Sequence, residues 1–193
     1  MPRPKQTSDD EILETGARLM SELGPGGLTF QSLAHQAGVS PATLVQRFGT
    51  KDAMIVSIAK HAGKGFVQTF AKLNSDIKNP LQRLVAFGDV FAALMGTPAT
   101  FANNLAFFQL DLINPELNAM TRESYHDFRA LLEATVREAI EQELLKDADS
   151  CSLATLLHAT YQGSLMNWAI YQQDSATEYM RTNVKLLLEQ YSL

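Results

Sequence analysis

Residues 28–54 read LTFQSLAHQAGVSPATLVQRFGTKDAM, and this stretch decides the fold. It contains two short runs, each preceded by a hydroxyl-bearing residue and followed by glycine. Thr29 is placed to cap the first run, because its side-chain oxygen accepts a hydrogen bond from a free N–H group of the first turn. Gly38 ends that run, because glycine adopts the positive φ of a helix terminus at little cost. We therefore expect a short helix between Thr29 and Gly38.

The second run begins with Ser40 as its cap and Pro41 at the first helical position, where a missing N–H group costs nothing. Leu44 and Phe48 follow at i and i+4 and form one apolar face. Gly49 ends the run, and a longer helix is expected directly after it. Two short helices joined by a tight turn and followed by a third are the layout of a helix-turn-helix DNA-binding motif.

These residues resemble the N-terminal signature of the tetracycline-repressor (TetR) family of bacterial regulators. The resemblance rests on residues 38–44 (GVSPATL) and 48–53 (FGTKDA), and it covers roughly the first quarter of the chain. Two positions depart from the pattern: Val45 replaces a usual tyrosine, and Arg47 replaces a common histidine. The resemblance implies a ligand-responsive transcriptional regulator, a repressor that binds a palindromic operator in double-stranded DNA as a homodimer. A small apolar or aromatic effector would release it.

The helical turn that buries Leu44 and Phe48 directs the opposite side of the second helix outward. We expect the residues on this side and at the helix starts to contact DNA, either as base readers or as phosphate anchors. The predicted DNA-binding residues are Thr29, Gln31, Ser40, Pro41, Ala42, Thr43, Gln46, Arg47 and Lys51. Among them, Thr29, Arg47 and Lys51 are assigned to phosphates.

The composition fits this interpretation. A chain of 193 residues with 46% hydrophobic side chains is long and apolar enough to form a folded core. No apolar run approaches the ~20 residues that span a bilayer, and the first residues lack the apolar segment of a secretory signal. The single cysteine, Cys151, cannot form an internal disulfide, which fits a reducing compartment. We therefore expect a cytoplasmic protein with no membrane partner.

The net charge of −5 taken alone disfavours a nucleic-acid partner, so the distribution of the charges along the chain matters. Residues 1–60 contain as many basic as acidic side chains, so the acidic excess lies in the rest of the chain. The acids at 9–11 fall in the first turn of an expected helix, where they stabilise its dipole. Arg47 and Lys51 lie at the end of the motif, so a small phosphate-facing patch is compatible with the acidic total.

The rest of the chain predicts further helices and no strand. Beyond the two short helices of the motif, apolar periodicity and proline or glycine breaks place helices at residues 8–23, 50–74, 80–95, 99–110, 115–145, 150–173 and 175–191. We predict an all-α fold of about nine helices. Residues 1–54 would form the helix-turn-helix DNA-binding domain, and residues 55–193 a helical-bundle domain for ligand binding and dimerisation.

The second domain is rich in aromatic and sulfur-containing side chains. Each of them alone is most simply a core residue, but together they can surround an apolar cavity with a few polar groups. The predicted ligand-binding residues are Phe87, Phe91, Met95, Phe107, Phe108, Tyr125, Phe128, His158, Tyr161 and Trp168. The alternative is a closed core without a cavity.

The last two helices are candidates for a dimer interface. Leu153, Leu157, Tyr161 and Leu165 form an apolar stripe at intervals of four. Helices at these positions pair with their copies in the TetR family, and small DNA-binding domains gain affinity from two half-sites. The alternative is that the stripe only covers the core of its own chain.

Enzymatic interpretations have weaker support. Glu123 and His126 form one Glu-x-x-His pair, but a di-iron bundle needs a second pair, which the sequence lacks. Cys151 and His158 would lie two helical turns, ~10 Å, apart, too far for a nucleophile and its base. We expect no catalytic residues, no metal and no cofactor. The alternative is a helical-bundle enzyme or small-molecule carrier with an incidental N-terminal resemblance.

Overall fold

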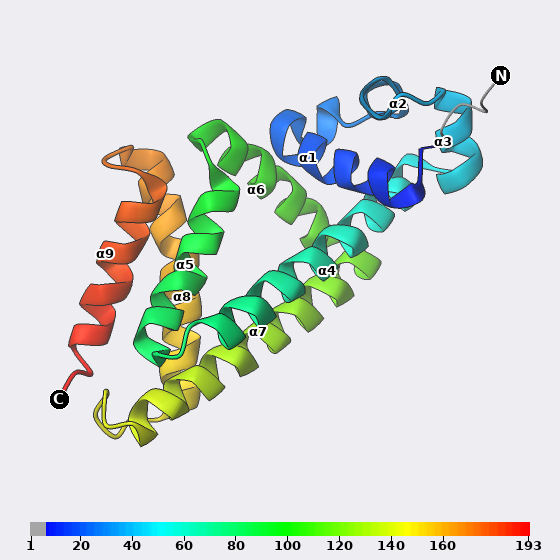
Figure 1. Ribbon diagram of the computed structural model, residues 1–193. Helices are drawn as coiled ribbons and strands as arrows, with labels where there is room; N and C mark the ends of the chain where they lie inside the picture. Colours follow the sequence, from blue (N-terminus) through cyan, green and yellow to red (C-terminus); the bar gives the residue numbers. More distant parts are fainter. Residues whose placement is uncertain (1–6) are drawn as a thin grey trace. The chain divides into compact units, whose positions relative to one another are not determined.

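The computed structural model describes residues 7–193, and within them it contains nine helices and no strand (Figure 1). The helices are α1 (Asp9–Gly27), α2 (Phe30–Ala37), α3 (Pro41–Phe48), α4 (Lys51–Asp76), α5 (Pro80–Met95), α6 (Pro98–Ile113), α7 (Pro115–Glu141), α8 (Ser150–Tyr171) and α9 (Ala176–Glu189). The predicted all-α fold is confirmed.

The caps predicted for the two short helices are present. The Thr29 side chain accepts a hydrogen bond from the Ser32 N–H group, and the Ser32 side chain accepts one from the Thr29 N–H group. Ser40 caps α3 with one bond of this kind, because its side chain accepts a hydrogen bond from the Thr43 N–H group, and Pro41 lies in the first turn. Both helices end at glycines with positive φ, 68° at Gly38 and 74° at Gly49. The positive φ of Gly38 allows the tight turn between α2 and α3.

Several helix ends differ from the expected ones. The first helix continues to Gly27 through a local break at Gly24, whose φ is 65°. The helix expected to reach residue 145 ends at Glu141, because Glu143 adopts a left-handed conformation and the Leu144 N–H group donates back to the Ala139 carbonyl. These differences move boundaries and leave the order of the elements unchanged.

The described chain forms two compact units, each with its own core. Unit 1 comprises the residues up to Val67 together with Ala102–Thr121, and unit 2 comprises Gln68–Phe101 and Arg122–Leu193. These units differ from the two functional domains expected from the sequence, residues 1–54 and 55–193. That functional division stays a prediction. No single helix among the described residues meets the length and apolarity needed to cross a membrane, although α5 and α6 do so when taken together as a bent pair.

The core of unit 1 joins the three N-terminal helices to the start of α4. Its fully buried side chains include Ile12, Leu33, Leu44 and Ile58. A Cβ atom at Gly16 would lie 2.5 Å from the Cδ1 atom of Ile58, so a larger residue there would force the Ile58 side chain to move. This packing holds α2 and α3 by their inner faces and leaves their outer faces to solvent.

The core of unit 2 is formed by α5, α8 and α9 with segments of α4 and α7. Helix α9 packs against both α5 and α8. Phe87, Leu157 and Tyr161 are fully buried there. The Tyr161 hydroxyl donates a hydrogen bond of 2.6 Å to the Leu84 carbonyl, and burial raises the pKa of this hydroxyl above its ordinary value. A neutral, hydrogen-bonded tyrosine thus lies at the centre of the core.

Candidate nucleic-acid interface and effector core

Helix α3 has one buried face and one solvent-exposed face, as its sequence predicts. Leu44 is fully buried in the core of unit 1. The predicted contact residues that lie exposed on α2, α3 and the turn between them are Gln31, Ser40, Pro41, Ala42 and Gln46. Because a helix enters the major groove by its exposed face, these residues form a surface of the right kind for reading base edges.

The hydroxyl groups of Thr29 and Thr43 are already engaged within the motif. Thr29 Oγ1 accepts from the Ser32 N–H group at 3.0 Å. Thr43 Oγ1 lies 2.9 Å from Ser40 Oγ, and both side chains belong to the first turn of α3. These bonds fix the starts of the two helices, so the backbone at each start is set before any ligand is bound.

Arg47 lies against α1 instead of on the outer face where the helical turn alone would place it. Its Nη1 atom is 2.7 Å from Asp9 Oδ1 and donates to the Thr7 carbonyl at 3.1 Å. The side chain is only 20% exposed. The carboxylate supplies a charge-assisted partner that the local sequence does not reveal, since Asp9 lies 38 positions away. The role of Arg47 at DNA stays a prediction.

Lys51 is also held within unit 1. Its Nζ atom donates a hydrogen bond of 2.8 Å to the Pro25 carbonyl, next to the break in α1. The side chain is partly buried. Lys51 therefore ties the first turn of α4 to the end of α1, while its charge remains at the edge of the motif.

Val45 is a candidate contact residue that the predicted set omits. Its side chain is 48% exposed on α3, next to the exposed Gln46. An exposed apolar side chain on this face can contact the C5-methyl group of thymine. The signal was available in the sequence, because the spacing that buries Leu44 and Phe48 turns Val45 outward.

Unit 2 contains a cluster of aromatic rings from four helices. Phe128 lies at its centre, with ring centroids 4.7 Å from Phe70, 5.2 Å from Phe91 and 6.1 Å from Tyr161. Phe87 also contacts Phe128, at 6.1 Å. The structure thus brings together four of the predicted ligand-binding residues and adds Phe70, which is not among the predicted ones. We refer to these five residues as the aromatic cluster.

Two polar rings border the aromatic cluster. The His158 ring lies 5.3 Å from Phe128 and 4.8 Å from Tyr125. Burial lowers the pKa of His158, and the positive charge of Arg129 lowers it further, so the imidazole is neutral at neutral pH. The Tyr125 hydroxyl accepts a hydrogen bond of 2.6 Å from Gln162. The border therefore offers neutral hydrogen-bonding groups beside an apolar core.

The other predicted ligand-binding residues are not part of this cluster. Phe107 and Phe108 belong to unit 1, where Phe107 packs in the core with the DNA-binding helices. Trp168 is buried near the end of α8, and its Nε1 atom donates to the Asp174 carbonyl at 3.4 Å. Met95 is half-buried in the last turn of α5. The ten predicted residues therefore do not surround one common cavity.

Helix α8 carries two apolar stripes with different roles. The predicted stripe of Leu153, Leu157, Tyr161 and Leu165 is buried within unit 2, so the alternative that it covers its own core is correct for these four residues. A second stripe points to solvent and consists of Leu156, Ala159, Gly163, Met166 and Ile170. Met166 is 41% exposed and Ile170 65% exposed. We call this second set the exposed stripe.

The comparisons with known proteins agree with this architecture. The family described as "Bacterial regulatory proteins, tetR family" matches residues 12–58, and the one described as "BetI-type transcriptional repressor, C-terminal" matches residues 80–191, more than half of the chain. The chain belongs to the TetR family. It is a transcriptional regulator of TetR/BetI type and not an enzyme. The helix-turn-helix of residues 28–54 is the DNA-binding motif of this TetR-family protein.

Named relatives of this TetR-family chain are distant. It is 19% identical over 191 residues to the HTH-type transcriptional regulator HbdR of Aromatoleum sp. (strain CIB), covering 98% of this chain and 83% of that protein. It is 26% identical to the regulator BetI of Brucella anthropi, covering 68% of this chain and 66% of that protein. A transcriptional regulator from Saccharomonospora viridis, solved in complex with choline, shares the fold with a TM-score of 0.78 and 21% identity, covering 93% of this chain and 94% of that one.

Three of the residues considered for enzymatic chemistry are exposed, namely Glu123, His126 and Cys151. Between residues 7 and 193, the structure brings together no group of three or more histidine, cysteine, aspartate or glutamate side chains that could hold a metal ion. His126 is exposed, with its neighbour Asp127 as its polar contact. Cys151 is exposed at the start of α8.

Proposed function

We propose that this TetR-family protein is a ligand-responsive repressor that acts in the cytoplasm. It binds a palindromic operator in double-stranded DNA as a homodimer and is released by a small apolar or aromatic effector. The observation that carries the proposal is the exposed, capped face of α3 above a fully buried Leu44. A rigid helix with an exposed polar face is what the major groove accommodates.

On DNA, we assign base contacts to the exposed face of the motif. Gln31, Thr43 and Gln46 supply hydrogen-bonding groups, and Pro41 with Ala42 allows the start of α3 to approach the groove closely. Thr29, Ser40, Lys51 and Arg47 lie at helix ends, where phosphate contacts set the register. Because Arg47 and Lys51 already have partners in unit 1, their phosphate contacts require those bonds to be exchanged or shared.

We assign the homodimer interface to α8 and α9, with the exposed stripe of α8 as its apolar part. Leu156, Met166 and Ile170 supply apolar area, and Ala159 with Gly163 lets two helices approach closely. A two-fold dimer places two copies of α3 on half-sites about one helical turn, ~34 Å, apart. In such a dimer, the exposed stripe of each protomer is covered by the partner.

We assign effector binding to the aromatic cluster and its polar border. The rings of Phe91 and Phe128 provide an apolar wall, and neutral His158 and Tyr125 can orient a ligand by hydrogen bonds. Helix α4 begins directly after α3 and contains Phe70 of the cluster near its other end, so it is the covalent connection between the proposed effector site and the DNA-binding motif. A hundredfold loss of operator affinity requires ~2.7 kcal/mol of coupling.

A quaternary ammonium ion is a second candidate effector. The related regulator from Saccharomonospora viridis was solved with choline. Aromatic faces attract such cations through their negative quadrupole, and the cluster brings together five rings from four helices. The cation would occupy the same cluster as an uncharged effector.

The test is a mobility-shift titration of DNA taken from upstream of the protein's own coding sequence. A thermal-shift screen of apolar and aromatic metabolites, with choline included, supplies the effectors to be added. The proposal requires a specific complex that at least one stabilising compound dissociates. A compound that stabilises the protein and leaves operator affinity unchanged would contradict the assigned release mechanism.

A further inference from the structure

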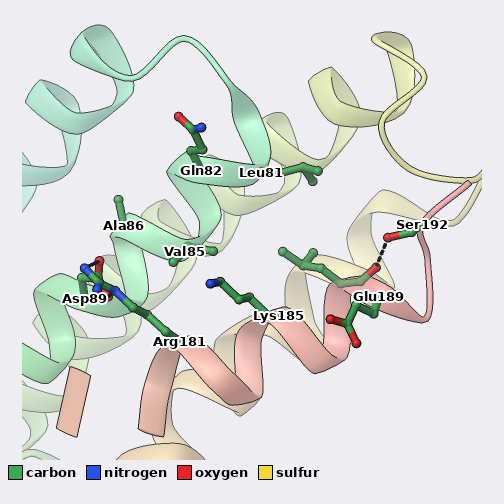
Figure 2. Close-up of a pocket in the computed structure, with 10 residues that line it drawn as sticks. Leu81, Gln82, Val85, Ala86, Asp89, Arg181, Lys185, Glu189 and Ser192 are labelled. Atoms are coloured by element: carbon green, nitrogen blue, oxygen red, sulfur yellow. Dashed lines mark hydrogen bonds and ion pairs between the residues drawn. The ribbon is translucent and has the colours of Figure 1, made fainter. Parts of the chain in front are cut away.

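A groove with a volume of about 470 Å³ lies along the surface where α5 packs against α9 in unit 2 (Figure 2). This is within the ~300–1,000 Å³ range of small-molecule sites. Its lining residues share no member with the aromatic cluster, so it is a separate feature of the unit. The apolar part of its wall is formed by Leu81, Val85 and Ala86 of α5 and by Leu188 of α9.

One end of the groove is closed by an ion pair that is already satisfied. Arg181 Nε and Nη2 donate to the two carboxylate oxygens of Asp89 at 2.8 and 2.9 Å. This two-bond geometry fixes both side chains and joins α9 to α5. The charge of Arg181 is thereby matched within the protein, so this pair forms a polar end wall of the groove.

The ammonium group of Lys185, one turn further along α9, has neither an ion pair nor a hydrogen bond to any of residues 7–193. Figure 2 shows its side chain reaching across the groove toward Val85 of α5, while the carboxylate of Glu189 points away from α5. A cation without a partner therefore lies over an apolar wall. This is the arrangement that an anionic group attached to an apolar body would complete.

We propose that this groove binds a small carboxylate with an apolar tail. The carboxylate pairs with Lys185 Nζ, and the tail lies along Leu81, Val85 and Leu188. An apolar cation is excluded, because Lys185 repels it and the Asp89 carboxylate is held by Arg181. The site is thus distinguished from the aromatic cluster by the sign of charge that it accepts.

The test is isothermal titration of the full-length protein with octanoate, and with octan-1-ol as the uncharged probe of the same length. Octanoate binds the unmodified protein and octan-1-ol binds at least tenfold more weakly, because a charge-assisted hydrogen bond is lost. Lys185→Met weakens octanoate binding at least tenfold, and Lys185→Arg retains it. Lys72→Met removes an exposed lysine of α4 outside the groove and leaves binding unchanged.

Three outcomes would overturn the proposal. The first is unchanged octanoate affinity in Lys185→Met, which would place the ligand elsewhere in the protein, including the aromatic cluster. The second is equal affinity for octan-1-ol, which would show that the charge has no role. The third is no octanoate binding to the unmodified protein at millimolar concentration. Operator binding is not part of this measurement, so the groove and the proposed repressor function fail independently.

Discussion

Arg47 of α3 and Asp9 of α1 form an ion pair in which Nη1 lies 2.7 Å from Oδ1. The pair joins the end of the DNA-binding helix to the start of the first helix. It also neutralises one positive charge next to the surface that is proposed to face the phosphate backbone. The bond to Asp9 supports α3 and competes with the proposed contact of Arg47 with DNA, and substitutions can separate the two roles.

Asp9→Asn is expected to tighten non-specific DNA binding and to steepen its salt dependence by about one unit of slope, because Arg47 is then free to neutralise a phosphate. The measurement is DNA affinity as a function of salt concentration. Asp10→Asn is the matched control, since it removes the same charge from the same turn and does not contact Arg47. Equal salt slopes for the two variants would show that Arg47 does not compete in this way.

Lys51→Ala is expected to weaken binding to every DNA sequence and to reduce the salt slope by about one, because a phosphate contact is lost. Gln46→Ala is expected to cost about 1–3 kcal/mol at one base pair and to relax preference there. Affinities for the operator and for its single-base variants distinguish the two effects. A uniform loss for Gln46→Ala across all sequences would contradict its role as a base reader.

Met166→Glu in the exposed stripe is expected to split the dimer and leave the protomer folded, because the charge would be buried only at the interface. Leu157→Ala is expected instead to destabilise the protomer by about 2–5 kcal/mol, since Leu157 is fully buried in unit 2. Light scattering at micromolar concentration and thermal unfolding report the two effects. Leu94→Glu is the control, an exposed leucine of α5 outside the stripe. A monomeric unmodified protein would refute the interface.

Stability is expected to fall as the pH drops below about 6.5, the pKa of a free histidine, because the unfolded chain then takes up a proton at His158 that the folded chain does not. Because the pKa of His158 is lowered in the folded protein, the free energy of unfolding is unaffected by this residue above about pH 6.5 and decreases progressively as the pH falls below that value. His158→Gln should remove this part of the pH dependence. Unfolding midpoints of the two proteins measured between pH 5 and pH 8 test it, and parallel curves would contradict it.

The DNA-binding motif was predictable because its signals are local. Ser40, Pro41 and Gly49 define α3 through hydrogen bonds and φ angles within a few residues. The position of Arg47 was not predictable in this way, because its partner Asp9 is distant in sequence. Local periodicity gives the direction of a side chain, and only the tertiary fold gives its partner.

Helix α8 shows a second limit of periodicity. Leu157 and Leu156 are adjacent apolar residues, and each belongs to a stripe with helical spacing. The stripe of Leu157 is buried in the protomer and that of Leu156 is exposed. A helix that is apolar on most sides does not reveal from its sequence which side meets its own core. For the same reason, the sequence does not distinguish Phe107 from the aromatic residues of unit 2, although it packs in unit 1.

The most direct test of the central claim is fluorescence anisotropy with two duplexes of equal length and composition, one taken from upstream of the coding sequence and one scrambled. The account predicts an affinity for the first at least ~10³-fold higher at physiological salt. It also predicts that Gln46→Ala reduces this ratio, while Gln173→Ala, at an exposed position after α8, does not. Equal affinity of the unmodified protein for both duplexes would contradict the claim that the exposed face of α3 reads DNA sequence.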